Sequence, residues 1–187
     1  MTTSYHIITQ CLLFIYSFIW ISMRLSSLFF SFWYNIFMEI KFMKEAIRYG
    51  RRSLLSDDVP IGCVVVKNNK IIGYGYNKKE DLQNPTAHAE IMAISMASRH
   101  LNSYHLEGCD IYVTLEPCLM CVGAILNARI KNLYFGARNK RFGAVVSHQK
   151  IEKLITNHRI NYEYGILERE CASQISSFFS DLRKRSK

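Results

Sequence analysis

The sequence predicts an α/β domain with a single mixed β-sheet of about five strands and helices on both faces. Two observations lead to this class. The β-rich runs IGCVVV (61–66) and KIIGYGY (70–76) are separated by Asn68 and Asn69, which favour a tight hairpin turn. After this hairpin, segments of helical periodicity alternate with short β-rich runs, and such alternation is typical of strands joined by crossover helices.

The remaining elements follow from the same patterns. An opening helix is predicted over 38–55, where Ile40, Met43 and Ile47 recur at helical spacing with Lys and Arg on the other face. The elements expected after the hairpin are a helix over 87–99, a strand over 110–115, a helix over 117–129, a strand over 132–136, a short helix near 148–156, a strand over 160–164 and a last helix from about 167.

Charge and cysteine usage narrow the class of protein. The 187 residues carry a formal net charge of +9, and a basic domain of this size indicates a polyanionic partner such as nucleic acid. Of the six cysteines, only Cys118 and Cys121 have motif spacing. We therefore expect the others to be buried thiols rather than a disulfide framework, and the compartment to be reducing, namely the cytoplasm.

Two short motifs form a split cluster of metal-ligand type, AHAE at 87–90 and PCLMC at 117–121. Zinc favours four tetrahedral ligands and is well suited to thiolates and a neutral imidazole. His88, Cys118 and Cys121 supply three ligands, so the motifs predict a catalytic zinc site with a water in the fourth position. The alternative is a structural site closed by Cys109 or Cys63.

Glu90 is the remaining polar group of the first motif. Two residues after His88 on a helix, it would point about 200° away, which favours a role beside the metal over ligation. A carboxylate there can take a proton from water and deliver it to a leaving amine. Thr86 and Pro117 mark the two expected helix starts, and the positive end of a helix lowers thiol pKa values.

Several longer stretches carry a family resemblance. The order His-x-Glu … Pro-Cys-x-x-Cys is a signature of zinc-dependent nucleobase deaminases. The chain resembles bacterial tRNA-specific adenosine deaminases over about residues 39–185, in DVPIGCVVV (58–66), GYGYN (73–77), NPTAHAEIMA (84–93), YVTLEPCLMCVGAI (112–125), FGAR (135–138) and the tail from 157 to 185.

The resemblance implies a fold, a reaction and an assembly. The fold is a cytidine-deaminase-like three-layer sandwich, and the reaction is hydrolytic deamination of adenosine to inosine at the wobble position of tRNA, with a zinc-activated water. One zinc ion per subunit, a homodimer and an anticodon stem-loop as substrate are implied as well. By position, His88, Cys118 and Cys121 resemble the zinc ligands, Glu90 the proton shuttle, and Asn77 the side chain that hydrogen-bonds the target base.

One position departs from the family pattern. After Gly-Ala-Arg the family usually has Asp, and this chain has Asn139. That residue lies near the nucleic-acid backbone in the family, so the departure bears on strictness toward RNA.

Two basic clusters are candidates for contact with phosphates. The chain ends in LRKRSK (182–187), which contains Arg183, Lys184 and Arg185, and a second cluster lies at 138–141 beside the expected site. We expect the tail to bind phosphates of the substrate. The alternative is a solvated helix end whose charges compensate the helix dipole.

Residues 1–38 form an apolar N-terminal extension, and residues 39–187 form the expected deaminase domain. Residues 2–23 contain no Lys, Arg, Asp or Glu, yet a basic n-region and a small-residue cleavage site are both missing. We expect this segment to be upstream sequence included by an early start. A membrane anchor is the alternative, since about 20 apolar residues span a bilayer.

Two other functions fit part of this pattern. A deaminase of free nucleobases or nucleotides would share every zinc residue. A non-catalytic zinc-stabilised RNA-binding domain would need neither a free Glu90 nor an open fourth ligand position. Metal analysis together with an ammonia-release assay separates the RNA-binding domain from an enzyme. Incubation with an anticodon stem-loop and with free adenosine, cytidine and guanine separates the two deaminases.

Overall fold

The computed structural model describes residues 33–151 and 158–185. The chain divides into two compact units, Met1–Met38 and Glu39–Lys187. In the first unit, residues 33–38 are helical, and the expectations for residues 1–32 lie outside the described residues. Within the described part of the chain, no helix is long and apolar enough to cross a membrane.

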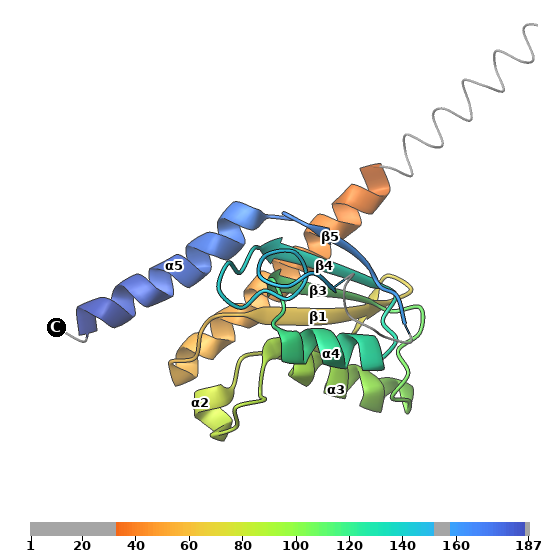
Figure 1. Cartoon of the computed structure of the whole chain (residues 1–187), viewed down its shortest axis with the longest axis horizontal. Coiled ribbons are helices and arrows are strands. Elements are labelled where there is room, and N and C mark those ends of the chain that lie inside the picture. The colour runs from red at the N-terminus through yellow and green to blue at the C-terminus, as the bar shows by residue number, and fades with distance from the viewer. Residues whose placement is uncertain (1–32, 152–157, 186–187) are drawn as a thin grey trace, which may run out of the picture. The chain divides into compact units, whose positions relative to one another are not determined.

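The second unit is built on a single sheet of five strands in the order β2-β1-β3-β4-β5 (Figure 1). β1 pairs antiparallel with β2 and β3, whereas β4 pairs parallel with β3 and β5. The predicted mixed sheet is therefore confirmed. Its strands are β1 (Gly62–Lys67), β2 (Lys70–Tyr76), β3 (Asp110–Leu115), β4 (Asn132–Ala137) and β5 (Asn161–Tyr164).

The hairpin turn between β1 and β2 is confirmed as well. Asn68 and Asn69 have φ angles of 49° and 60°, and they connect Lys67 to its partner Lys70. Two consecutive positive φ angles are the feature of the turn whose twist matches that of the flanking strands, and Asn tolerates them better than most residues.

Helices cover both faces of the sheet, as the sequence predicted (Figure 1). α3 (Ala89–Leu101) and α4 (Leu119–Asn127) lie on one face. The opposite face carries the helical residues 39–50, whose Phe42 contacts Tyr112 of β3, and α5 (Glu168–Arg185), which packs on β4 and β3.

Two local details differ from the sequence expectations, and a third expectation falls largely outside the described residues. The opening helix ends at residue 50, and a 3₁₀ helix η1 (Arg51–Ser56) follows. Gly50 at this boundary packs closely on the start of β1, because a Cβ there would lie 2.9 Å from the backbone nitrogen of Gly62. A short helix α2 (Lys79–Leu82) was not predicted. The helix expected near 148–156 falls largely on residues 152–157, which lie outside the described residues.

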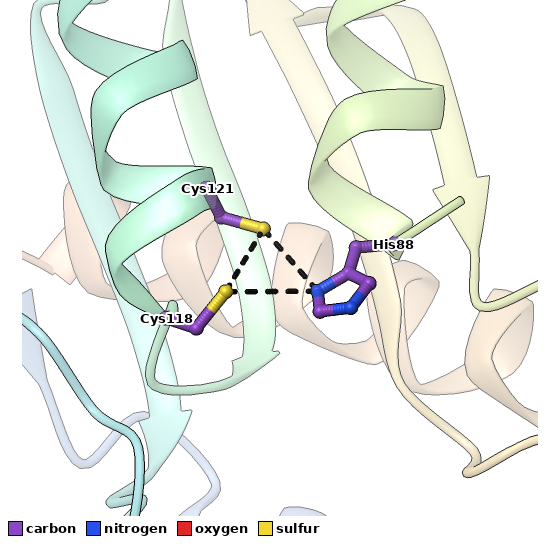
Figure 2. Close-up of side chains that lie close together, drawn as sticks. All are labelled: His88, Cys118 and Cys121. Carbon is purple, nitrogen blue, oxygen red and sulfur yellow. Dashed lines mark hydrogen bonds between the residues drawn. The ribbon is translucent and has the colours of Figure 1, made fainter. Parts of the chain in front are cut away.

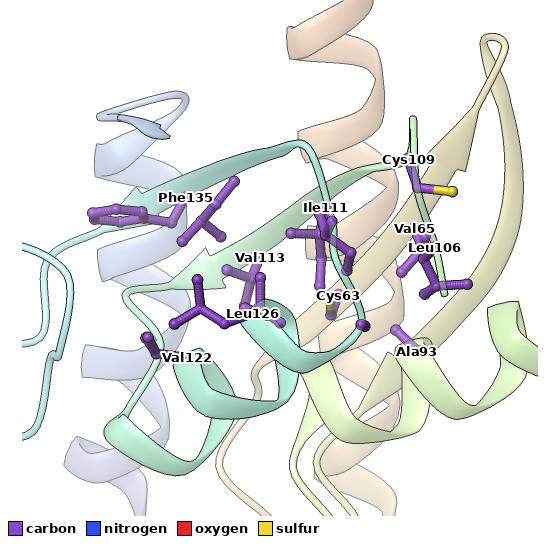
Figure 3. Close-up of a cluster of buried hydrophobic side chains, with 14 of the residues drawn as sticks. Cys63, Val65, Ala93, Leu106, Cys109, Ile111, Val113, Val122, Leu126 and Phe135 are labelled. Carbon is purple, nitrogen blue, oxygen red and sulfur yellow. The ribbon is translucent and has the colours of Figure 1, made fainter. Parts of the chain in front are cut away.

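The main hydrophobic core lies between the sheet and the helices α3 and α4 (Figure 3). Val65, Ile111, Val113 and Phe135 project from the strands and are completely buried. Alternation along β3 sends Ile111 and Val113 into this core and Tyr112 to the other face.

α3 packs unusually close to β2. A Cβ at Gly73 would lie 2.5 Å from the carbonyl oxygen of Ala93, and one at Gly75 would overlap that of Ala89. Glycine on the strand facing alanine on the helix lets the two backbones approach. The contact fixes the helix whose N-terminus leads into the candidate site.

Candidate active site

The candidate site lies where the N-termini of α3 and α4 come together. His88 is the N-cap residue of α3 and Cys118 that of α4, and both have extended backbone angles. The sequence expectation placed both inside a first helical turn, which is wrong by one or two residues. Thr86 does not cap α3, since its backbone nitrogen and hydroxyl both donate to Oδ1 of Asn84, at 2.9 Å and 2.8 Å.

His88, Cys118 and Cys121 form a triangle of potential ligand atoms (Figure 2). Nδ1 of His88 lies 3.7 Å from Sγ of Cys118 and 3.5 Å from Sγ of Cys121, and the two sulfur atoms are 3.6 Å apart. Tetrahedral angles with a Zn–S bond of about 2.3 Å and a Zn–N bond of about 2.0–2.1 Å require S···S and S···N separations of about 3.8 Å and 3.6 Å. The donor set therefore fits a zinc ion in both chemistry and spacing.

One of the two sulfur atoms is held as a thiolate, and a thiolate favours a cation beside it. Hydrogen bonding with Cys121 lowers the pKa of Cys118 to about 4, so this group is a thiolate at neutral pH. The same hydrogen bond, together with burial, raises the pKa of Cys121. A hydrogen bond with Cys118 raises the pKa of His88. The three groups thus compete for shared protons, which a bound metal would displace.

The alternative of a closed structural site is not supported by the arrangement of the other cysteines. Cys63 on β1 and Cys109 before β3 are completely buried in the hydrophobic core. Cys109 precedes β3, whereas Cys118 follows it, so the strand separates them. Among the residues that the structure describes, the metal-ligand group consists of His88, Cys118 and Cys121 alone.

Glu90 is a buried carboxylate, only 4% exposed, in the first turn of α3. Burial raises its pKa to about 7, and the positive charge of His88 opposes this shift. Because His88 is a cap residue rather than a helical one, the expected angle of about 200° between the two side chains does not apply. Glu90 lines the same pocket as His88 and Cys118 without belonging to the metal-ligand group.

Asn77 follows β2 directly and is 3% exposed. Its Oδ1 accepts a hydrogen bond of 3.0 Å from the backbone nitrogen of Ala89, one of the free N–H groups at the start of α3. Since this oxygen is engaged, the amide nitrogen is the group that Asn77 can offer to a ligand in the pocket, which it lines.

A pocket of about 780 Å³ opens over these residues. Its lining includes His88 and Cys118 of the metal-ligand group, together with basic and aromatic residues that we call the rim. The aromatic rim residues are Phe142 and Phe179, and the basic ones are Lys79, Arg138, Lys140 and Arg141. The basic residues of this rim attract an anionic ligand, and its aromatic rings offer a surface on which nucleic-acid bases can stack.

Two buried carboxylates that the sequence analysis did not identify hold this rim. Asp58, 2% exposed, accepts hydrogen bonds from the backbone nitrogens of Lys79 and Glu80 at 3.0 Å and 3.1 Å, and so fixes the start of α2. Glu116, also 2% exposed, accepts hydrogen bonds from the loop after β4. Burial alone would raise the pKa of Glu116, but bonds from Ser147 and the loop backbone hold it below its usual value.

Asn139 lies within the basic part of the rim, between Arg138 and Lys140. Its Oδ1 accepts hydrogen bonds from the backbone nitrogens of Arg141 and Phe142, at 3.2 Å and 3.1 Å. The side chain thus closes the turn that presents the basic residues, and it borders the pocket at the same time.

The basic tail is not part of the pocket. Lys184 pairs with Asp181 at 3.3 Å, and Arg185 pairs with Asp57 at 2.8 Å beside a different cavity of about 490 Å³. Arg183 lies four residues beyond Phe179 on α5, which is one helical turn past the pocket rim. The structure therefore brings together His88, Cys118, Cys121, Glu90, Asn77 and Asn139, and leaves the tail at a distance along α5.

Residues 38–137 match the family known as the cytidine and deoxycytidylate deaminase zinc-binding region. Among similar proteins, the tRNA-specific adenosine deaminase of Aquifex aeolicus (strain VF5) is 45% identical over 143 residues, which are 76% of this chain and 94% of that protein. The tRNA-specific adenosine deaminase of Bacillus subtilis (strain 168) is 39% identical over 147 residues, covering 78% of this chain and 91% of its own.

Solved structures give the same picture. One from studies of A-to-I editing by tRNA:A34 deaminases at the wobble position of transfer RNA matches with a TM-score of 0.69 and 40% identity, over 72% of this chain and 98% of that chain. The guanine deaminase from Nitrosomonas europaea matches with a TM-score of 0.66 and 21% identity, over 75% and 84%. At that identity the likeness concerns the fold alone.

Proposed function

Because this chain belongs to the tRNA-specific adenosine deaminases of the cytidine and deoxycytidylate deaminase zinc-binding family, we propose that it converts adenosine to inosine at the wobble position of a tRNA. The observation that carries the chemistry is the His88–Cys118–Cys121 triangle, whose atoms have tetrahedral separations, beside the buried carboxylate of Glu90. The relatives supply the identity of the base and of the RNA.

His88, Cys118 and Cys121 would hold one zinc ion per chain. Bound zinc supplies a Lewis acid that lowers the pKa of a water molecule to about 7. The residues themselves prepare the site, since the positive ends of α3 and α4 both face it and favour thiolates.

Glu90 manages the protons of the reaction. It takes one proton from the attacking water and passes it to the adenine ring nitrogen. It then takes the second proton from the new hydroxyl at C6 and donates it to the leaving amine, which departs as ammonia while the C6 carbonyl forms. Its burial suits this role, because a carboxylate held away from bulk water keeps its protons within the site.

Asn77 orients the base by donating from its amide nitrogen. Its Oδ1 accepts a hydrogen bond from the backbone nitrogen of Ala89, which fixes the direction of the amide nitrogen. Glu90 follows Ala89 in the same turn of α3, so the amide nitrogen also keeps a fixed direction relative to Glu90. A base reaches these groups only after it leaves its stack, which favours a single-stranded loop such as an anticodon loop over a duplex.

The phosphates on either side of the base would meet the basic rim, and the tail would meet phosphates farther away. Arg138, Lys140 and Arg141 border the pocket, whereas Arg183 lies one turn of α5 beyond it. Asn139 stands between these cations where the family usually has Asp, so this position bears on strictness toward RNA over DNA.

The remaining proposals concern the context of the enzyme. Residues 39–187 form the working domain, and residues 1–38 are an extension that the reaction does not need. The enzyme acts as a homodimer in the cytoplasm, where its tRNA substrate and a reducing environment for Cys118 and Cys121 occur together.

In the decisive test, purified zinc-loaded protein is incubated with an anticodon stem-loop that has adenosine at the wobble position. Inosine in the RNA and one ammonia per inosine are expected. Free adenosine, cytidine and guanine serve as parallel substrates, and the Glu90→Gln protein serves as the control. Equal turnover of free nucleosides and stem-loop would contradict the tRNA assignment, and zinc binding without any ammonia release would indicate an RNA-binding domain.

A further inference from the structure

Glu116 lies between the last residue of β3 and Pro117, one step before the metal-ligand motif. Its side chain is 2% exposed, and its backbone nitrogen donates to the carbonyl oxygen of Ala137 on β4 at 2.8 Å. A carboxylate withdrawn from water in this way must be satisfied by other donors, because an unpaired buried charge is very costly.

All of its donors come from one segment of the chain, residues 139–147. Oε1 accepts hydrogen bonds from the backbone nitrogens of Val145, Val146 and Ser147, at 3.1 Å, 2.7 Å and 2.9 Å. Oε2 accepts from the backbone nitrogen of Asn139 at 3.0 Å and from the hydroxyl of Ser147. Three consecutive N–H groups around one oxygen form an anion-binding concavity, here filled by the protein's own carboxylate.

This segment has little regular structure of its own. It consists of turns and a single bridge between Gly143 and Cys118, and the backbone nitrogen of Ala144 donates to the carbonyl oxygen of Pro117 at 2.9 Å. Its first residues, Asn139 to Phe142, border the pocket. The carboxylate therefore joins the basic rim to the stretch of chain that leads into the metal-ligand helix.

The carboxylate packs closely against the backbone of Gly143. A Cβ at Gly143 would overlap the carboxyl group of Glu116 and would lie 2.6 Å from the carbonyl oxygen of Asn139. Glycine at this position is thus a condition for the carboxylate to occupy its place.

We propose that Glu116 is the positioning residue of the substrate rim: it holds residues 139–147 so that the cations that grip the RNA backbone stand at a fixed distance from the metal ligands. The proposal rests on the function given above, because it assigns the rim to RNA phosphates. Glu116 does not touch the reacting base, and its effect passes through the loop.

Glu116→Gln in the full-length, zinc-loaded protein tests this role. Glutamine keeps the shape but turns one acceptor oxygen into a donor that faces N–H groups, so part of the loop loses its anchor. We expect KM for the stem-loop to rise on the order of tenfold or more, while kcat changes by less than about threefold, because the rim contributes binding rather than chemistry. Zinc content should stay at that of the wild type.

Hydrogen exchange gives a readout that does not depend on activity. The amides of Val145, Val146 and Ser147 should exchange faster in Glu116→Gln, and those of α3 should not. Glu107→Gln is the matched control, since Glu107 is exposed and bonds only across the surface to Arg129. Ser147→Ala removes one donor and keeps the carboxylate, so it should raise KM in the same direction by a smaller factor.

Gly143→Ala adds a further check, because the overlap of its Cβ with the carboxylate should also raise KM. In the double variant with Glu116→Ala this overlap is gone, so the two KM changes should combine to less than their product. Unchanged KM and unchanged exchange in Glu116→Gln would overturn the proposal, as would loss of zinc with KM unaltered. Failure of the proposed function appears separately, as a wild-type protein that forms no inosine from the stem-loop.

Discussion

The close packing of α3 on β2 makes Gly75 a sensitive test of how the metal site is held. A Cβ at this position would lie 2.6 Å from the backbone nitrogen of Ala93 and would overlap the carbonyl oxygen of Ala89. Ordinary contacts begin at about 3.5 Å, so Gly75→Ala requires α3 to retreat by about 1 Å. Ala89 directly follows His88, and the retreat therefore carries Nδ1 away from the sulfur atoms that now lie at 3.5 Å and 3.7 Å.

A zinc site tolerates errors of about 0.2 Å in its bond lengths, which is much less than this displacement. We expect zinc affinity to fall roughly 10- to 100-fold, as for other changes that misplace a ligand. Overpacking should also cost about 1–3 kcal/mol of stability, which lowers Tm by roughly 2–12 °C in a domain of this size. Competition with a chromogenic chelator measures the affinity, and thermal melting of zinc-loaded protein measures the stability.

Gly123→Ala is the matched control, because nothing lies within 4 Å of its added Cβ. It sits inside α4, where alanine is favoured over glycine by about 1 kcal/mol, so Tm should rise. Replacement of glycine by alanine should therefore lower Tm at position 75 on β2 and raise it at position 123 on α4. Wild-type zinc affinity and Tm in Gly75→Ala would refute the reasoning that this helix cannot move without the metal site.

Four further outcomes follow from the site and the domain boundary. Glu90→Gln should retain zinc and lose about 10²–10⁴-fold in kcat, measured by inosine formation, because only proton transfer is removed. Cys121→Ala should lose zinc in metal analysis and unfold at a lower temperature. Deletion of residues 1–37 should leave a zinc-loaded, active enzyme, whereas loss of activity would favour a working role for that segment. Truncation after Asp181 should weaken RNA binding and flatten its dependence on salt, by roughly one unit of log–log slope per lost phosphate contact, with kcat at saturating RNA little changed.

The sequence was sufficient to predict the sheet, its hairpin and the residues of the metal-ligand group. Asn68 and Asn69 identified the turn, and the spacing of Cys118 and Cys121 identified one side of the site, because turn residues and ligand pairs act over a few positions. Local patterns of this kind are present in the sequence before any tertiary contact forms.

The features that were missed depend on partners far away in the sequence. α2 begins where Asp58 accepts hydrogen bonds from the backbone nitrogens of Lys79 and Glu80, which are 21 and 22 positions away in the sequence. The four residues of α2 therefore do not predict a helix by themselves. The opening helix ends where Gly50 meets Gly62. Glu116 did leave a sign, a charged residue at the end of an apolar strand, but its partners appear only when the loop has folded over it.

A zinc ion in the metal-ligand group would also cross-link two parts of the chain. His88 and Cys118 are 30 positions apart, on the caps of different helices, so a zinc ion that binds both closes a long loop. A covalent cross-link over such a loop contributes about 3–4 kcal/mol by restricting the unfolded chain. The fraction of newly synthesised protein that escapes proteolysis should therefore depend on the zinc supply of the cell. Zinc starvation would reduce the abundance of the enzyme as well as its turnover.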